Sequence, residues 1–569
     1  MLTKSNKKTS RTVLFALTAA FIIILPIISS TAKAAGMYIV FSIMALLSAW
    51  RIYETKRIAL SGSITAFSLF TLYAVLCGVF CSDSGGQLQS VMLMFMLLMT
   101  AFLSADYFEN IGENSDRKLM YLMAASGVCC AVLNIFVWLL QMVPLGEYSA
   151  FRAGIGQNDA LGAFMAIGIL FCIFLKKGAG KSRATKLYAM LVPMAFVLIM
   201  TKSICAFILM AALFIAMKNK KAGKRAAAIS IILVVICALI FILGNHQAFC
   251  DAFLAGIKRP FGLGGGGYLA RQEEYMGSYY PKVSYFPFIA RVVSDFGVFG
   301  LAFSIFLVFR YAALMKKILS PKTVSSFCVL LFVLFAPFKN EYAVLVFLTG
   351  FLTYAEASYF KTYSVKKKNL LYAVNILCIL SLLSGFLFGH SLLKMRADAE
   401  YKSENYSSAY ILYKNAAMIN VCDSESCLKA LASLRKSDMA IEKSEQAHTL
   451  MKKAQWRSRG SVDAYVEKAR YYGACSDYIN AADNWRIVLM KAPHNYKYNI
   501  SFVKLLYKKI KDCEKGSPEA KKVYNEISEV SEKTQNIDAK KIINDIRDKA
   551  LIYTKSELKA PKEKEIDAP

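Results

Sequence analysis

The sequence predicts an all-α protein in which a bundle of about 12 or 13 transmembrane helices precedes a soluble helical-repeat domain. Hydrophobic residues make up 56% of the chain, and the mean hydropathy is +0.41. Uncharged apolar runs of bilayer length follow one another as far as residue 390, whereas the remainder is polar and rich in helix-forming residues. In that polar part, aromatic and small residues recur at the spacing of paired helices.

We therefore expect three segments: a transmembrane domain over residues 1–390, a tetratricopeptide-like helical domain over 391–555, and a charged, disordered tail over 556–569. The first apolar run follows a basic start and resembles a signal peptide, but further apolar runs come at once, so we interpret it as an uncleaved span. The expected spans lie near 12–31, 37–50, 58–80, 88–107, 119–142, 159–175, 187–200, 203–217, 226–244, 286–312, 323–338, 342–360 and 370–390.

The formal net charge is +30. Such an excess is also found in nucleic-acid-binding proteins. Here the basic residues lie mostly in short loops between apolar runs, which is the pattern of cytoplasmic loops in membrane proteins. With the N-terminus in the cytoplasm, the basic loops at 51–57, 176–186, 218–225 and 361–368 all fall inside, provided that 187–217 forms two spans. We predict a multi-pass cell-membrane protein with an extracytoplasmic C-terminal domain and no nucleic-acid partner.

Two stretches of the polar part fit the tetratricopeptide pattern, a helix pair of about 34 residues. A third, weaker one follows Ser517-Pro518, and 423–458 fits a degenerate repeat. Repeats of this kind bind partners, so we expect a protein partner here, with a generic amphipathic bundle as the alternative. The residues that carry the first two stretches are Ala399, Tyr401, Tyr406, Ala409, Tyr413 and Ala416, then Tyr465, Tyr472, Tyr478, Ala481, Trp485 and Pro493.

Two patches on the expected external side carry polar residues at the ends of spans. Arg152 stands beside glycines just before a span that opens near Asn158. A guanidinium, backbone N–H groups and a helix dipole together favour phosphate; the alternative is an interfacial arginine in a turn. Lys202 and Ser203 lie between two short apolar runs, where a lysine is costly unless it reaches water or a partner. The alternative for Lys202 is a snorkelling side chain in a tight turn.

The third patch is the long loop at 245–285, rich in glycine, tyrosine and charge. Its cations suit a diphosphate, its glycines permit close backbone approach, and its carboxylates suit a general base. The residues concerned are Lys258, Arg259, Gly262, Gly264, Arg271, Glu273 and Glu274. Just beyond the loop, Arg291 and Asp295 are spaced to form an ion pair or to line a polar cavity. The alternative for the loop is a flexible, solvated connection.

Taken together, the patches resemble the O-antigen ligase and Wzy-type polysaccharide polymerase superfamily over roughly residues 120–310. The order and spacing of four stretches carry the resemblance. They are Arg152-Ala-Gly-Ile-Gly-Gln-Asn158, Leu198-Ile-Met-Thr-Lys-Ser203 with Ala206 and Phe207, Ile257-Lys-Arg-Pro-Phe-Gly-Leu-Gly-Gly-Gly-Gly-Tyr268, and Ser294-Asp-Phe-Gly-Val-Phe-Gly-Leu301.

The chain departs from the family at three points. Ser203 is followed by Ile204 where the family has arginine, 245–254 contains no arginine, and the histidine that the ligase branch carries before its acidic residue is missing around Phe286. These departures favour a polymerase or a divergent relative over a ligase.

The resemblance implies an enzyme that transfers oligosaccharide from an undecaprenyl-diphosphate carrier to an acceptor glycan on the external face, without a metal or other cofactor. Such chemistry needs fixed cations for the departing diphosphate, a carboxylate for the acceptor's proton, and a lateral groove between spans for the lipid. The substrate-binding candidates are Arg152, Asn158, Lys202, Ser203, Lys258, Arg259, Gly262, Gly264, Arg271 and Arg291; the base candidates are Glu273, Glu274 and Asp295.

Two other classes of function share these features. A transporter or flippase of lipid-linked glycans would have the same spans and external cations, and a membrane scaffold would use the repeat domain alone. Transporters are typified by internal repeats and by ionisable groups at mid-span. In this chain the ionisable residues gather at span ends and the two halves show no repeat, which favours the enzyme.

Overall fold

The computed structural model describes residues 33–555 except 79–80, 82, 112–114, 146–157, 177–179, 219–222, 245, 277–286, 337–360 and 438–443. The spans predicted at 12–31 and 342–360 and the predicted tail at 556–569 lie outside the described residues. What is described is helical but for two short strands.

The chain divides into two compact units. The N-terminal unit comprises Met1–Leu269, Val283–Met395 and Met418–Cys422. The C-terminal unit comprises Ala270–Lys282, Arg396–Ala417 and Asp423–Pro569. Three helices are shared between the units: α11 (Gly267–Tyr275), α15 (Lys367–Lys402) and, at its last two residues, α16 (Tyr406–Ile419). The boundary predicted after residue 390 therefore lies inside a continuous helix, and a piece of the 245–285 segment belongs to the C-terminal unit.

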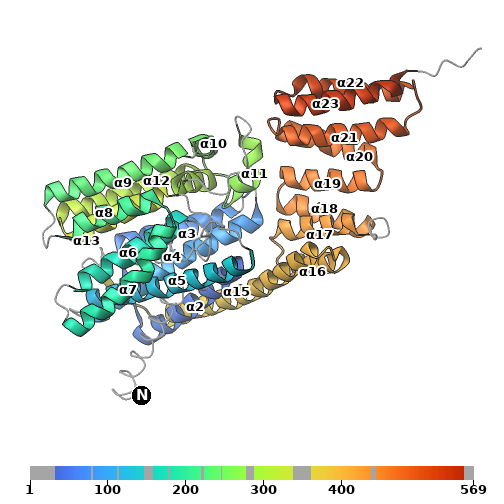
Figure 1. Ribbon diagram of the computed structural model, residues 1–569. Coiled ribbons are helices and arrows are strands. Elements are labelled where there is room, and N and C mark those ends of the chain that lie inside the picture. Colours follow the sequence, from blue (N-terminus) through green and yellow to red (C-terminus); the bar gives the residue numbers. More distant parts are fainter. Residues whose placement is uncertain are drawn as a thin grey trace, which may run out of the picture. The chain divides into compact units, whose positions relative to one another are not determined.

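The N-terminal unit is a bundle of apolar helices (Figure 1). Each predicted span within the described residues falls on a helix, and most bounds agree to within a few residues. The exception is the span predicted at 370–390, whose helix α15 continues to Lys402. The chain turns between α7 and α8 as predicted. Six of the helices are long and apolar enough to cross a membrane. Besides α11 and α15 the helices are α2 (Lys33–Thr55), α3 (Gly62–Cys77), α4 (Ser84–Ile111), α5 (Ser115–Leu145), α6 (Asn158–Lys176), α7 (Lys181–Met200), α8 (Ile204–Lys218), α9 (Lys224–Gly244), α10 (His246–Ile257), α12 (Phe288–Lys317) and α13 (Pro321–Phe335).

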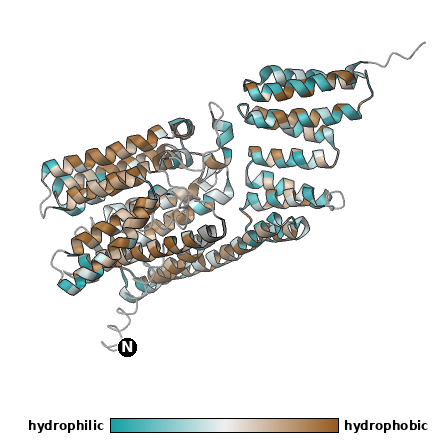
Figure 2. Ribbon diagram, in the orientation of Figure 1, coloured by the Kyte–Doolittle hydropathy of each residue, from teal (hydrophilic) through white to brown (hydrophobic). Residues whose placement is uncertain are grey.

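The outer faces of these helices are apolar as well as their buried faces. On α9, for example, Val234 and Cys237 are buried in the core, whereas Ile232, Leu239 and Leu243 are more than half exposed. Figure 2 shows the same pattern: the middle of most helices in this unit is hydrophobic, and hydrophilic residues gather at the helix ends. A helix that is apolar all round is typical of a protein interior or a membrane span.

A two-stranded sheet joins two distant basic segments of the N-terminal unit. Strand β1 (Arg57–Leu60) pairs antiparallel with β2 (Lys361–Ser364), with Arg57 opposite Ser364. The predicted span at 58–80 therefore begins in a strand, and its helix starts at Gly62 after the cap Ser61, whose side chain accepts a hydrogen bond from the Ile64 amide. The pairing fixes the ends of α2, α3 and α15 next to one another.

The C-terminal unit is a succession of short amphipathic helices. They are the end of α15, α16 (Tyr406–Ile419), α17 (Ser424–Lys436), α18 (Ser444–Arg457), α19 (Val462–Ala474), α20 (Tyr478–Lys491), α21 (Tyr496–Asp512), α22 (Pro518–Lys533), α23 (Ile537–Ala550) and the 3-10 helix η3 (Leu551–Thr554). Side-chain oxygens of Asp477, Ser517 and Asn536 cap the helices that follow them. Ala481 and Trp485, which the repeat pattern singles out, are buried in its core.

Candidate functional site

The centre of the candidate site is a break in α12 at Gly297. Its backbone has φ +63° and ψ −146°, a conformation open to glycine alone, and a Cβ atom here would collide with the carbonyl oxygen of Pro260. The break leaves backbone groups of α12 without helical partners, and the preceding segment supplies them. The amides of Leu263 and Gly264 donate to the carbonyl oxygens of Ser294 and Asp295, each at 2.9 Å.

Residues 262–267, which we call the glycine loop, pack into this break. Gly262, Gly264 and Gly266 have positive φ, and a Cβ atom on Gly264 or Gly265 would collide with Cys81 or Ser90. The whole loop is buried. The interpretation of 245–285 as a flexible, solvated connection is therefore wrong for the buried glycine loop and for the helices α10 and α11, whereas residues 258–261 between α10 and the loop are exposed.

Every amide of the glycine loop is used inside the protein. Those of 262, 263, 264 and 267 donate to backbone carbonyls, the Gly265 amide donates to Oε1 of Gln87, and the Gly266 amide donates to Oδ2 of Asp295 at 2.9 Å. The glycines consequently shape the loop around Asp295. They do not present a row of free amides to an anion.

Asp295 is the most deeply buried of the three predicted base candidates. It is 2% exposed, and the Arg291 guanidinium lies 3.7 Å from Oδ2, which confirms the predicted ion pair. Its other oxygen, Oδ1, is buried and has no hydrogen-bond partner among the described residues. Such an orphaned carboxylate oxygen costs free energy unless a ligand or water donates to it.

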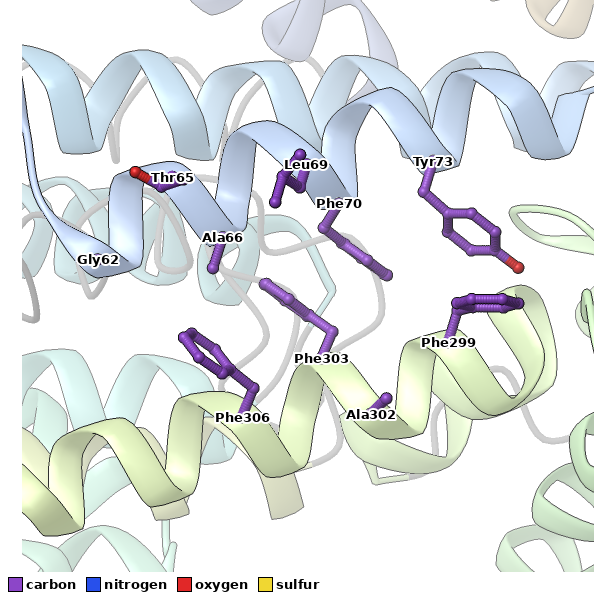
Figure 3. A pocket seen from close by; sticks show the side chains of 10 residues that line it. All are labelled: Gly62, Thr65, Ala66, Leu69, Phe70, Tyr73, Phe299, Ala302, Phe303 and Phe306. Carbon is purple, nitrogen blue, oxygen red and sulfur yellow. The ribbon is translucent and has the colours of Figure 1, made fainter.

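A groove of about 690 Å³ runs between α3 and α12 (Figure 3). Phe70 stacks on Phe303 in its middle with ring centroids 4.1 Å apart, and Tyr73 lies against Phe299 at one end. It is lined by Gly62, Thr65, Ala66, Leu69, Phe70, Tyr73, Phe299, Ala302, Phe303 and Phe306. Exposure of Leu69, Phe299 and Phe306 opens it to the outside of the unit.

The two ends of the groove differ in chemistry. At the Tyr73 end, the phenol donates to the carbonyl oxygen of Phe296 at 3.1 Å, so this end adjoins the residue after Asp295. At the other end, a Cβ on Gly62 would lie 2.9 Å from the Arg310 guanidinium. Gly62 and Tyr73 are separated by about 16 Å along α3, given a rise of ~1.5 Å per residue.

A second polar cluster lies where α6 begins and α7 turns into α8. The Ser203 hydroxyl donates to a carboxylate oxygen of Asp159, and Ser203 Oγ accepts from the Ala206 amide at 3.2 Å. Lys202 adopts φ +52° in the turn and its side chain is exposed. Asn158 is the first residue of α6. Arg152 lies outside the described residues.

Two other predicted cations, Lys258 and Arg259, are exposed where α10 ends and the chain approaches the glycine loop. They are therefore placed on the surface a few residues ahead of the loop that surrounds Asp295. Their predicted role toward a diphosphate stays a prediction.

Arg271, Glu273 and Glu274 belong to the C-terminal unit and are engaged there. Glu273 is 8% exposed and accepts hydrogen bonds from Tyr498 Oη at 2.7 Å and Asn495 Nδ2 at 3.3 Å. Lys491 Nζ lies 3.5 Å from Glu274. Of the three predicted base candidates, Asp295 alone combines burial with an oxygen that lacks a partner.

Sequence reasoning missed the residues that hold the site together. Asp159 accepts a hydrogen bond from the Ser203 hydroxyl, and Gln87 accepts one from the Gly265 amide. Tyr73 lies at one end of the groove and donates to the Phe296 carbonyl oxygen. A glutamine directly after Gly85-Gly86, in the opening turn of a span, was the one local signal of such a role. Among the described residues, no three His, Cys, Asp or Glu side chains gather as a metal site would require.

No protein-family model, no curated protein and no solved structure matches this chain. The resemblance to polysaccharide polymerases accordingly stays a prediction. The candidate site is defined by its own residues and their geometry.

We predict that Gly297→Ala destabilises the N-terminal unit by at least about 1–3 kcal/mol, the usual cost of a non-glycine residue in a rare backbone conformation. The collision with Pro260 adds to this cost. The measurement is the thermal unfolding midpoint of the detergent-solubilised protein. Gly385→Ala on α15, where a Cβ meets nothing within 4 Å, is the matched control and should not lower the midpoint, because alanine favours a helix more than glycine does. Equal midpoints for both variants would contradict the role given to the break.

Proposed function

We propose that this chain is a membrane-embedded glycosyltransferase, a polymerase that moves an oligosaccharide from an undecaprenyl-diphosphate carrier to an acceptor glycan on the extracytoplasmic face. The observation that carries the proposal is the Asp295 carboxylate: its Oδ1 is buried without a partner among the described residues. The next residue, Phe296, accepts a hydrogen bond from Tyr73, which lines one end of the apolar groove. An enzyme of this class needs a base for the acceptor hydroxyl next to a place for a lipid tail.

In this function the N-terminal unit is a bundle of about 12 or 13 membrane spans. The six helices of sufficient length, the shorter apolar helices among them and the apolar outer faces support this arrangement. The β1–β2 pair adds a constraint, because hydrogen-bonded strands lie on one side of a bilayer. The basic residues around both strands favour the cytoplasmic side for that pair.

In the proposed complex the groove between α3 and α12 holds part of the isoprenoid chain. Its lining is aliphatic and aromatic, and the exposed side chains along it would face lipid. Its Tyr73 end adjoins Phe296 and so leads toward Asp295. A carrier that lies along the groove would bring its headgroup to the glycine-loop end.

The proposed reaction is a glycosyl transfer with Asp295 as the base. The acceptor hydroxyl donates its proton to Asp295 while its oxygen bonds to the anomeric carbon of the donor sugar. The bond between that carbon and the diphosphate oxygen breaks, and the lipid diphosphate leaves with the electron pair. Cations stabilise the charge that grows on this oxygen; Arg291 beside Asp295 and the exposed Lys258 and Arg259 support that role.

A flippase for lipid-linked glycans is the second candidate, and the groove is the observation that favours it. A groove that leads from Arg310 to the glycine loop would suit a lipid that moves between leaflets. The orphaned oxygen of Asp295 has no evident use in that function. A membrane scaffold would need neither feature.

We predict that Asp295→Asn lowers the rate of glycan extension about a hundredfold or more, because an amide cannot accept the acceptor's proton. The measurement uses the purified protein in lipid vesicles with an undecaprenyl-diphosphate oligosaccharide, and follows glycan length and released lipid diphosphate. Glu54→Gln removes a carboxylate from a comparable pair, 3.8 Å from Arg51, and serves as the control. Extension at the wild-type rate in Asp295→Asn would exclude Asp295 as the base. Movement of unaltered lipid would favour the flippase.

We also predict that Ala302→Trp raises the KM for the lipid-linked donor severalfold, because an indole would fill the groove. Ala313→Trp on the exposed face of the same helix is the matched control and should leave the KM unchanged. The same KM in both variants would show that the groove does not hold the lipid.

The proposal places the C-terminal unit outside the cell. An alkaline phosphatase fused after Pro569 should therefore be active, whereas the same reporter fused after Lys366, next to β2, should be inactive. Both enzyme activities are compared with the amount of fusion protein in the membrane. If the phosphatase fusion after Pro569 is inactive, and a reporter that fluoresces only in the cytoplasm is fluorescent at the same position, the C-terminal unit lies in the cytoplasm and the proposed orientation is wrong.

A further inference from the structure

The C-terminal unit includes one short segment from far upstream, Ala270–Lys282, whose described part ends at Met276. Three of its residues make polar contacts with complementary groups of α20, α21 and the turn before α19. Arg271 donates through Nη2 to the Arg459 carbonyl oxygen at 2.5 Å, and the Glu274 carboxylate lies 3.7 Å from Arg271 Nε and 3.5 Å from Lys491 Nζ. The third residue, Glu273, is buried.

The strongest of these contacts is made by Glu273. Its carboxylate accepts from Tyr498 Oη through one oxygen and from Asn495 Nδ2 through the other. Burial raises the pKa of Tyr498, and the nearby Glu273 carboxylate raises it further, so this phenol keeps its proton and stays a donor. The two donors meet both oxygens of one carboxylate, an arrangement that suits an acidic side chain at this position.

The segment begins at a kink in α11. Arg271 has φ −122° and ψ 17°, values that break α11 into two helical pieces. Residues 267–269 belong to the N-terminal unit and residue 270 onward to the C-terminal unit. Only four residues separate Arg271 from Gly266, whose amide donates to Asp295. Residues 267–270, the first helical piece of α11, thus connect the two sets of contacts.

We propose that the surface formed by the Arg459 carbonyl, Lys491, Asn495 and Tyr498 is a binding site for residues 271–274 of this same chain, and that its occupancy holds the glycine loop in place around Asp295. Glu273 is thereby a positioning residue. The binding site stands on the contacts alone, whereas its effect on catalysis rests on the proposed function.

The charge pattern supports a dedicated site for this segment. The segment carries basic and acidic groups, and the surface offers the opposite partner for each: a carbonyl oxygen for Arg271, donors for Glu273 and a cation for Glu274. The helical repeats that the sequence predicts bind extended or helical segments of partners. Here the occupant is supplied by the same polypeptide.

The test measures amide hydrogen exchange of residues 268–276 in the full-length protein in lipid. Tyr498→Phe and Glu273→Gln should each speed exchange there about tenfold or more, the effect of losing one hydrogen bond to a buried charge. Exchange in α22 and α23 should not change. Tyr507→Phe, on the same helix but packed against Tyr553, is the matched control. The double variant should be no faster than either single variant, because both remove one shared contact.

Glycan extension by the same variants then tests the positioning role. We expect kcat to fall in Tyr498→Phe and Glu273→Gln with little change in the KM for the donor, and to stay at the wild-type value in Tyr507→Phe. Unchanged exchange at 268–276 in both variants would overturn the binding site. Faster exchange with an unchanged kcat would overturn the positioning role. If the wild-type protein extends no glycan, the proposed function fails, and the exchange rates alone decide the binding site.

Discussion

The bond between the Gly266 amide and the Asp295 carboxylate is the contact on which the candidate site depends. It exists because α12 breaks at Gly297 and because the glycine loop can follow the positive φ values that the break demands. Within a bundle of apolar helices, a carboxylate is tolerated only where fixed donors surround it. The glycine loop and Arg291 supply those donors to Oδ2 of Asp295, and the buried Oδ1 has no donor among the described residues.

This arrangement changes the physical role of the glycine-rich stretch. Glycine-rich loops often cradle phosphates with free amides, which is the reason that Gly262 and Gly264 are attractive as substrate-binding residues in the sequence. Here the amides are consumed in holding the loop to α4 and α12. Any anion at this end of the bundle would therefore have to be met by side chains, of which Lys258 and Arg259 are the exposed ones nearby in sequence.

The sequence predicts the helices of this protein well and their long-range contacts poorly. Hydropathy and loop charge locate the helices, the turn at Lys202 and the spacing of Arg291 and Asp295, because these are properties of neighbouring residues. The pairing of Arg57 with Ser364 and of Gly265 with Gln87 joins residues 307 and 178 positions apart, and no local period encodes it. Composition likewise suggests a solvated loop at 245–285. Glycine-rich segments occur both in solvated connections and where backbone is tightly buried, so composition alone does not distinguish the two.

The carboxylates near the glycine loop illustrate why residue type alone does not identify a base. Glu273 and Glu274 lie in an acidic, charged stretch that suggests chemistry, yet their oxygens are matched by donors from the C-terminal unit. A carboxylate that already accepts hydrogen bonds from a phenol and from an amide has lone pairs directed at those donors instead of at a substrate. Asp295 is buried in an apolar helix, where the sequence allows an ion pair with Arg291 or a polar cavity as well as a base, and it keeps one oxygen unmatched among the described residues. The number of hydrogen-bond donors at each carboxylate oxygen, more than its charge or position, distinguishes a carboxylate that anchors the structure from one that can accept a proton.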